Sequence, residues 1–144
     1  MYLIKVEDSF DSAHFLAGYC GKCSNIHGHR WRVEVEVSAS ELIQGGQNKG
    51  MVVDFSDLKS DLKEILDYYD HALIIEEGSL RAETLKNLIE DGFRVIELKF
   101  RPTAENFSFY LYSRICEKGY KTRRVTVYET PTNCASYESD EVRT

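Results

Sequence analysis

The segment 20–29 concentrates side chains that bind metals or transfer protons. It holds two cysteines and two histidines: Cys20, Cys23, His27 and His29. Residues i and i+2 of a β-strand project from the same face, so His27 and His29 can direct two imidazole nitrogens at one ion. With a third protein ligand and an open fourth position, such a pair forms a catalytic rather than a structural zinc centre.

His14 is the candidate third ligand. Residues 2–15 are predicted as a strand with His14 at the end of its apolar face, and residues 29–38 are the clearest strand of the chain because apolar and charged residues alternate strictly. If these two strands pair as an antiparallel hairpin, His14 lies beside His27 and His29 at one end of the sheet. We therefore predict a zinc triad of these three histidines.

A second metal site is compatible with the same segment. Cys20 and Cys23 have the Cys-x-x-Cys spacing of structural zinc sites, and with His27 and His29 they would close a four-ligand centre. That arrangement leaves His14 unused. It would make the protein a zinc-stabilised binding module rather than an enzyme.

Four further side chains are candidates for acid–base or binding chemistry, each with an ordinary structural alternative. Cys23 is either a small buried residue or a thiol whose pKa is lowered by a nearby cation. Asp70 and His71 follow a predicted helix and are also typical of a helix end. Glu129 falls on the apolar face of a strand, where a carboxylate needs donors: either a salt bridge or a flat heterocycle with paired N–H groups, such as an aminopyrimidinone.

Composition limits the class of protein. The 144 residues fit a single domain, 1–144, and the net charge of −6 argues against a nucleic-acid partner. The amino-terminal residues carry charges and resemble neither a signal peptide nor a membrane span. Without an export signal, the four cysteines are expected to be reduced thiols in a cytoplasmic protein.

The remaining elements predict an α+β fold. The order of strands and helices favours helices packed on one face of an antiparallel sheet. After the two strands, the predicted elements are a helix capped by Asp54 or Ser56 and ending near 67–69, a short helix at 79–91, a strand or extended connector at 93–100, a helix starting at Thr103, a strand at 123–130 and a short strand at 134–138.

Six motifs together resemble the 6-pyruvoyltetrahydropterin synthase superfamily, and in particular its bacterial branch, the 6-carboxytetrahydropterin synthases of queuosine biosynthesis. The resemblance covers nearly the whole chain, and the three residues between Cys23 and His27 are typical of that branch. The motifs are Phe10-Asp11-Ser12-Ala13-His14, Cys23-x3-His27-Gly28-His29, Val53-Asp54-Phe55-x2-Leu58-Lys59, Tyr69-Asp70-His71, Pro102-Thr103-Ala104-Glu105-Asn106 and Tyr128-Glu129-Thr130-Pro131-Thr132.

The resemblance implies roles for these residues. It implies Zn²⁺ on the three histidines, Cys23 as the proton-transfer thiol, Asp70 and His71 as its acid–base partner pair, and Glu129 as the carboxylate that anchors the pterin. It also implies the T-fold, in which sheets of several subunits close into a barrel, in a homohexamer with sites between subunits.

The implied reaction converts 7,8-dihydroneopterin triphosphate to 6-carboxy-5,6,7,8-tetrahydropterin with release of acetaldehyde and triphosphate. The alternative is a 6-pyruvoyltetrahydropterin synthase, which eliminates triphosphate and keeps the side chain. Because the substrate is anionic and the chain is acidic, we also expect a local basic patch. Its candidates are Lys22, Arg30, Arg32 and Arg101. Cys20 and the long connector 74–100 depart from the family pattern.

Overall fold

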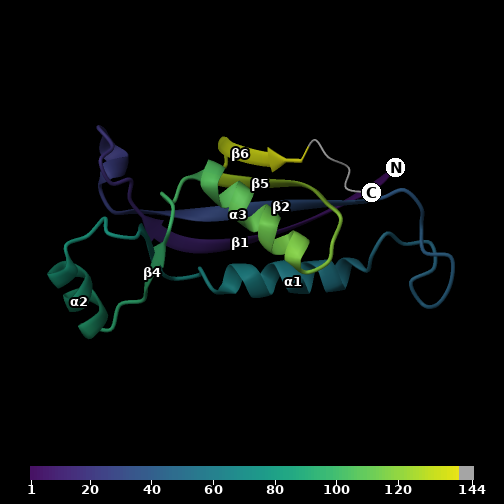
Figure 1. Ribbon diagram of the computed structural model, residues 1–144, viewed down its shortest axis with the longest axis horizontal. Coiled ribbons are helices and arrows are strands. Elements are labelled where there is room, and N and C mark those ends of the chain that lie inside the picture. The colour runs from purple at the N-terminus through teal and green to yellow at the C-terminus, as the bar shows by residue number, and fades with distance from the viewer. Residues whose placement is uncertain (140–144) are drawn as a thin grey trace.

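A six-stranded sheet forms the centre of the protein. The computed structural model describes residues 1–139, and Figure 1 shows the long strands crossing the molecule with the helices against them. The strand order is β4-β3-β1-β2-β5-β6. The strands are β1 (Tyr2–His14), β2 (His27–Ala39), β3 (Leu73–Glu76), β4 (Val95–Leu98), β5 (Thr122–Thr130) and β6 (Asn133–Glu138), and a short 3-10 turn, η1 (Lys22–Ser24), lies between β1 and β2.

The β1–β2 hairpin confirms the predicted antiparallel pairing. Each strand has 13 residues, and the register places His14 opposite His27 and Ser12 opposite His29. Trp31, Val33 and Val35 on β2 are fully buried, whereas their neighbours along the strand are not. This alternation gives the sheet one apolar face, and the histidines lie at the end of that same face.

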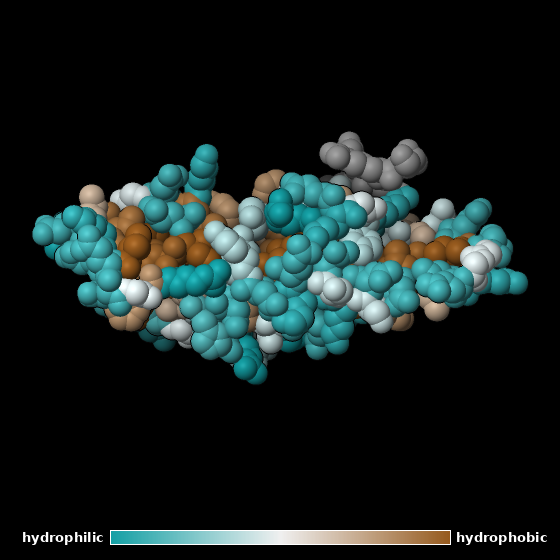
Figure 2. Space-filling model, turned by 90° about the horizontal axis from the view of Figure 1, so that it is seen from below, coloured by the Kyte–Doolittle hydropathy of each residue, from teal (hydrophilic) through white to brown (hydrophobic). Residues whose placement is uncertain are grey.

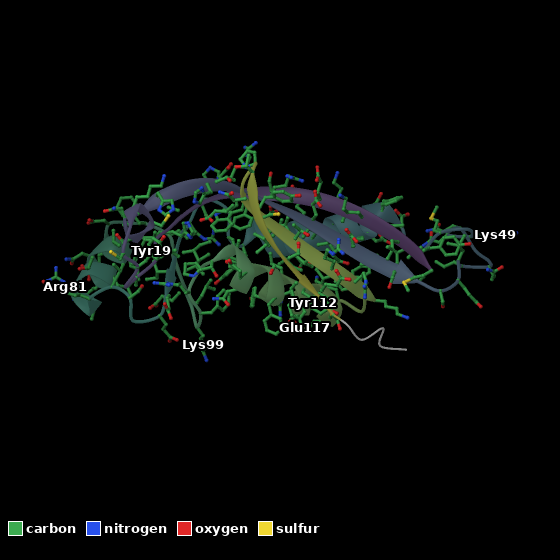
Figure 3. The ribbon with its side chains drawn as sticks, turned by 90° about the horizontal axis from the view of Figure 1, so that it is seen from above. Tyr19, Lys49, Arg81, Lys99, Tyr112 and Glu117 are labelled. Carbon is green, nitrogen blue, oxygen red and sulfur yellow. The ribbon has the colours of Figure 1, made fainter. Side chains whose placement is uncertain are left out.

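Two helices cover the apolar face. They are α1 (Phe55–Asp67) and α3 (Ala104–Glu117), whose buried residues include Leu58, Leu62, Phe107 and Leu111. Of the two predicted caps of α1, Asp54 is the one used, because its carboxylate accepts the backbone N–H of Ser56 at 2.7 Å. Figure 3 shows the strands arching over these helices. The α+β T-fold prediction is confirmed in this arrangement.

The sheet is mixed rather than wholly antiparallel, which corrects one part of the prediction. β3 runs parallel to the end of β1, at Ala13 and His14, and β4 runs parallel to β3. The four residues of β3 are too few for a periodic pattern, so this strand was not predicted from the sequence. The segment 93–100, left open between strand and connector, contains β4.

The third helix lies away from the core. α2 (Ala82–Glu90) has no buried residue, and it lies beside β4 at one end of the molecule (Figure 1). Ile89 and the following Phe93 are more than half exposed. In Figure 2, apolar side chains gather at this end, and hydrophilic side chains cover most of the middle. Within residues 1–139, no helix is both long enough and apolar enough to cross a membrane.

Candidate metal centre and acid–base pair

Three histidines and one glutamate meet at the end of the β1–β2 hairpin. The ligand atoms of His14, His27, His29 and Glu129 all lie within 4.8 Å of one another. His14 ends β1 and is fully buried, while the two other histidines begin β2. The predicted triad is therefore brought together, and Glu129, for which the sequence left a salt bridge and substrate binding open, joins it as a fourth side chain.

Strand alternation places Glu129 in this group, because it follows the buried Val125 and Val127 on the same face of β5. On β5, Tyr128 pairs with Cys134 and Thr130 pairs with Asn133, so β5 advances two residues where β6 advances one. Glu129 is the extra residue of this β-bulge on the side of β5 towards β6. Its carboxylate Oε1 lies 3.0 Å from His14 Nε2 and 3.1 Å from His29 Nε2.

Backbone carbonyls set the tautomers of two of the histidines. The Nδ1–H of His14 donates to the carbonyl of Pro102 at 2.8 Å, and the Nδ1–H of His27 donates to the carbonyl of Asn25 at 2.7 Å. A carbonyl can only accept, so both protons must be on Nδ1 in the neutral rings. Each Nε2 then directs a lone pair into the cluster, as metal-binding histidines do.

The resulting set of acceptors needs a cation. The Nε2 atoms of His14 and His27 are 3.1 Å apart, and Glu129 adds a carboxylate oxygen beside them. His29 Nε2 is buried and has no hydrogen bond of acceptable geometry among the described residues. Converging acceptors without donors repel one another unless a proton or a metal ion lies between them. These nitrogen and oxygen atoms therefore form a ligand set that fits a metal ion.

Burial and neighbouring groups lower the pKa values of both His29 and Glu129. Burial, the largest influence, lowers the pKa of His29 and favours its neutral, ligating form. Close contact with the His14 imidazole lowers the pKa of Glu129, so the carboxylate stays ionised. A neutral His29 and an ionised Glu129 both favour cation binding.

Asp70 and His71 form a second cluster beside β1. His71 Nδ1 and Asp70 Oδ2 are 2.8 Å apart, and the backbone N–H of Asp11 donates to Asp70 Oδ1 at 2.8 Å. The Asp11 N–H, followed by the His71 hydrogen bond, lowers the pKa of Asp70. The imidazole itself is 79% exposed. The carboxylate thus orients one ring nitrogen and leaves Nε2 directed away from it, which is the geometry of an oriented acid–base group.

The cysteines stay outside the metal cluster. Cys23 lies on η1 and is half-buried, and Cys20 is exposed. The carbonyl of Cys23 accepts the N–H of Leu16 at 2.8 Å, which ties this loop to the end of β1. In the chain from 1 to 139, the His/Cys/Asp/Glu group that could hold a metal contains neither cysteine, so the alternative four-ligand structural site is not formed there.

The candidate basic residues have different partners. Arg30 pairs with Asp11, and Arg32 pairs with Glu7 and Glu34. Arg101 instead donates to the carbonyl of Ala17 in the loop after β1. Of the four candidates, Lys22 and Arg101 are those without a carboxylate partner in the described part of the chain.

Comparisons with known proteins agree with this architecture. The family described as 6-pyruvoyl tetrahydropterin synthase matches residues 3–140. A Haemophilus influenzae protein named 6-carboxy-5,6,7,8-tetrahydropterin synthase is 38% identical over 96% of this chain and 99% of its own length. An Archaeoglobus fulgidus protein with the same name, marked putative, is 35% identical over 88% of this chain and 87% of its own.

Solved structures share the fold. An uncharacterized protein of Wolinella succinogenes has a TM-score of 0.78 at 23% identity, covering 96% of this chain and 98% of its own. The 6-pyruvoyl tetrahydropterin synthase of Plasmodium falciparum has a TM-score of 0.68 at 22% identity, covering 96% of this chain and 97% of its own.

The fold and the sequence similarities together define a pterin synthase of the T-fold class, with a cluster suited to a metal ion. The chain belongs to the 6-pyruvoyl tetrahydropterin synthase family. Its similarity to proteins named 6-carboxy-5,6,7,8-tetrahydropterin synthase extends over nearly its whole length.

Proposed function

We propose that this protein is a zinc-dependent 6-carboxytetrahydropterin synthase, a carbon–carbon lyase of queuosine biosynthesis in the cytoplasm. It would convert 7,8-dihydroneopterin triphosphate and water to 6-carboxy-5,6,7,8-tetrahydropterin, acetaldehyde and triphosphate. The observation that carries the proposal is the set of converging acceptors on His14, His27, His29 and Glu129, in a chain 38% identical to a protein of that name.

Zinc would be held by His14, His27 and His29. Three imidazoles are a common ligand set for catalytic zinc and leave a coordination position for another molecule. When bound, zinc supplies Lewis-acid chemistry, acidifying protons next to oxygens that it contacts.

Glu129 would anchor the pterin ring. Its side chain is 28% exposed, so one carboxylate edge remains accessible beside the buried histidines. A carboxylate held ionised can accept two parallel N–H groups from an aminopyrimidinone. The same carboxylate contacts the metal-binding histidines, which would set the distance between the ring and the metal ion.

Cys23 and the Asp70–His71 pair would move protons. As thiolate, Cys23 would remove a proton from the first carbon of the substrate side chain. His71, oriented by Asp70 at 2.8 Å, would exchange protons farther along that chain. Elimination of triphosphate and internal redox tautomerisation then reduce the ring without an organic cofactor, and cleavage with water yields acetaldehyde.

A 6-pyruvoyltetrahydropterin synthase is the second candidate, because the matched family bears that description. Such an enzyme would stop after elimination and tautomerisation. Incubation of the zinc-loaded protein with 7,8-dihydroneopterin triphosphate, followed by mass spectrometry, separates the two. We expect acetaldehyde and the 6-carboxy product, whereas a 6-pyruvoyl product would support the second candidate, and unchanged substrate would refute both.

We further propose that the single domain assembles into a homohexamer. β3 pairs with β1 only at Ala13 and His14, so most of the outer edge of β1 has no partner strand in the described chain. β6 forms the opposite edge of the sheet. Natural proteins pair or cover such edges. Sedimentation equilibrium should give about six times the 16.6 kDa chain mass, and a monomer would refute this assembly.

A further inference from the structure

The backbone of His71 adopts a conformation that its surroundings must hold. Among residues 1–139 it is the one non-glycine residue with positive φ, at 56°. For a residue with a Cβ atom, this left-handed region costs roughly 1–2 kcal/mol. Contacts from outside the turn therefore have to keep His71 and the preceding Asp70 in place.

Strand β1 holds one side of the turn. The N–H of His71 donates to the carbonyl of Asp11 at 2.6 Å, and the N–H of Asp11 donates to the carboxylate of Asp70 at 2.8 Å. The backbone N–H and the backbone carbonyl of Asp11 on β1 thus both hold the acid–base pair. These bonds involve the main chain of Asp11 and do not depend on its side chain.

Arg94 holds the other side. Its guanidinium donates from Nη1 to the carbonyl of Asp70 at 2.8 Å and from Nη2 to the carbonyl of Tyr68, and it lies 5.3 Å from the centroid of the Tyr68 ring. These carbonyls follow the end of α1 at Asp67, where carbonyl groups have no helical partner. One planar group therefore spans both carbonyls of the turn that carries the pair.

The backbone of Arg94 is itself fixed to the sheet. The N–H of Leu73 donates to the carbonyl of Arg94 at 3.0 Å, and the next residue, Val95, begins β4 opposite Leu73. The side chain consequently extends from the residue that precedes β4 to the turn that carries the pair. This connection arises from β3 and β4, the parallel part of the sheet.

We propose that Arg94 is a positioning residue for the Asp70–His71 pair. It contacts carbonyl oxygens of the turn and not the acid–base side chains, so it acts through their orientation. The rigid fork of arginine can engage two carbonyls at once, which the point charge of lysine does not reproduce. The catalytic consequence rests on the proposed function, whereas the structural one does not.

Amide hydrogen exchange tests the structural consequence without substrate. In Arg94→Gln, the amide of His71 should exchange about tenfold faster or more, and exchange in the middle of β2 should not change. Arg81→Gln is the matched control, because Arg81 makes no capping contact and lies at the outer end of the same connector (Figure 3). Unchanged exchange at His71 in Arg94→Gln would overturn the proposal.

Kinetics test the catalytic consequence. Small misplacements of a catalytic group cost up to about 10²-fold in rate, so Arg94→Gln should lower kcat roughly 10- to 100-fold with KM and zinc content unchanged. Arg94→Lys should recover part of this loss. In a His71→Ala background, Arg94→Gln should cause no further loss, because the group that it positions is absent.

The outcomes are separable from those of the proposed function. An unchanged kcat in Arg94→Gln, or a full additional loss in the His71→Ala background, would overturn the positioning role. If the unaltered protein turns over no dihydroneopterin triphosphate, the proposed function fails, and the exchange of the His71 amide still decides whether Arg94 holds the turn.

Discussion

Removal of the metal ion should lower the thermal stability of this protein by an amount that depends on His14. The four ligand atoms already lie within 4.8 Å of one another in the folded chain, whereas unfolding separates residues 14, 27, 29 and 129. Zinc at the proposed site would therefore bind the folded state in strong preference to the unfolded state. It would also relieve the repulsion among the Nε2 lone pairs and the Glu129 carboxylate.

The size of the effect follows from mass action. At a free zinc concentration about 100 times Kd, the gain in unfolding free energy is about 2.7 kcal/mol. For a domain of this length, 1 kcal/mol corresponds to about 3 °C in Tm, so we expect a shift of about 8 °C. Loss of a supporting contact alone can weaken metal affinity up to about 100-fold. Losing a ligand in His14→Ala should weaken zinc affinity by at least about 100-fold. The shift in Tm on zinc binding would then fall to about 1 °C.

The assay is thermal unfolding followed by circular dichroism at fixed protein concentration, first with chelator and then with buffered zinc. Cys20→Ala is the matched control, because Cys20 is exposed and outside the metal cluster, and its shift should equal that of the unaltered protein. An equal shift in His14→Ala would refute the triad. A shift abolished by Cys20→Ala would instead support the cysteine-containing structural site.

Three further predictions concern the side chains around the cluster. Cys23→Ala should lower kcat by about 10²–10⁴-fold while zinc stays bound, as measured by turnover and metal analysis, and full activity would move the thiol role to Cys20. Glu129→Gln should raise KM about 10- to 100-fold, because a hydrogen bond to a charged group is worth about 1.5–3 kcal/mol, and loss of zinc instead would make Glu129 a required ligand. The pKa of Asp70 is lowered in the folded state by the Asp11 N–H and by His71, so its stabilising effect is present above about pH 4, its unfolded value, and is lost as pH falls through the lower folded value. The stability difference between the unaltered protein and Asp70→Asn, from urea unfolding, should therefore shrink below about pH 4, and a constant difference from pH 3 to 7 would contradict this.

Periodicity predicted the parts of the fold that local patterns specify. The strands that contain His14 and Trp31, and the helices capped by Asp54 and Thr103, were predicted because alternation, helical spacing and capping side chains are local properties. β3 was missed because three apolar residues followed by a glutamate do not distinguish a strand from a turn. Its parallel pairing with β1 and β4 depends on contacts between distant segments.

The sequence by itself determined that His27 and His29 lie on the same face of their strand, because alternate residues of a strand share a face whatever else surrounds them. It also determined the family, through six motifs in order. Only the tertiary structure decided that Glu129 comes within contact distance of His14 and His29 and that the carbonyls of Asn25 and Pro102 set the histidine tautomers. Only the tertiary structure brought Arg94 to the turn of His71. These contacts join segments up to 88 residues apart, and no local pattern encodes which backbone oxygen a distant side chain will meet.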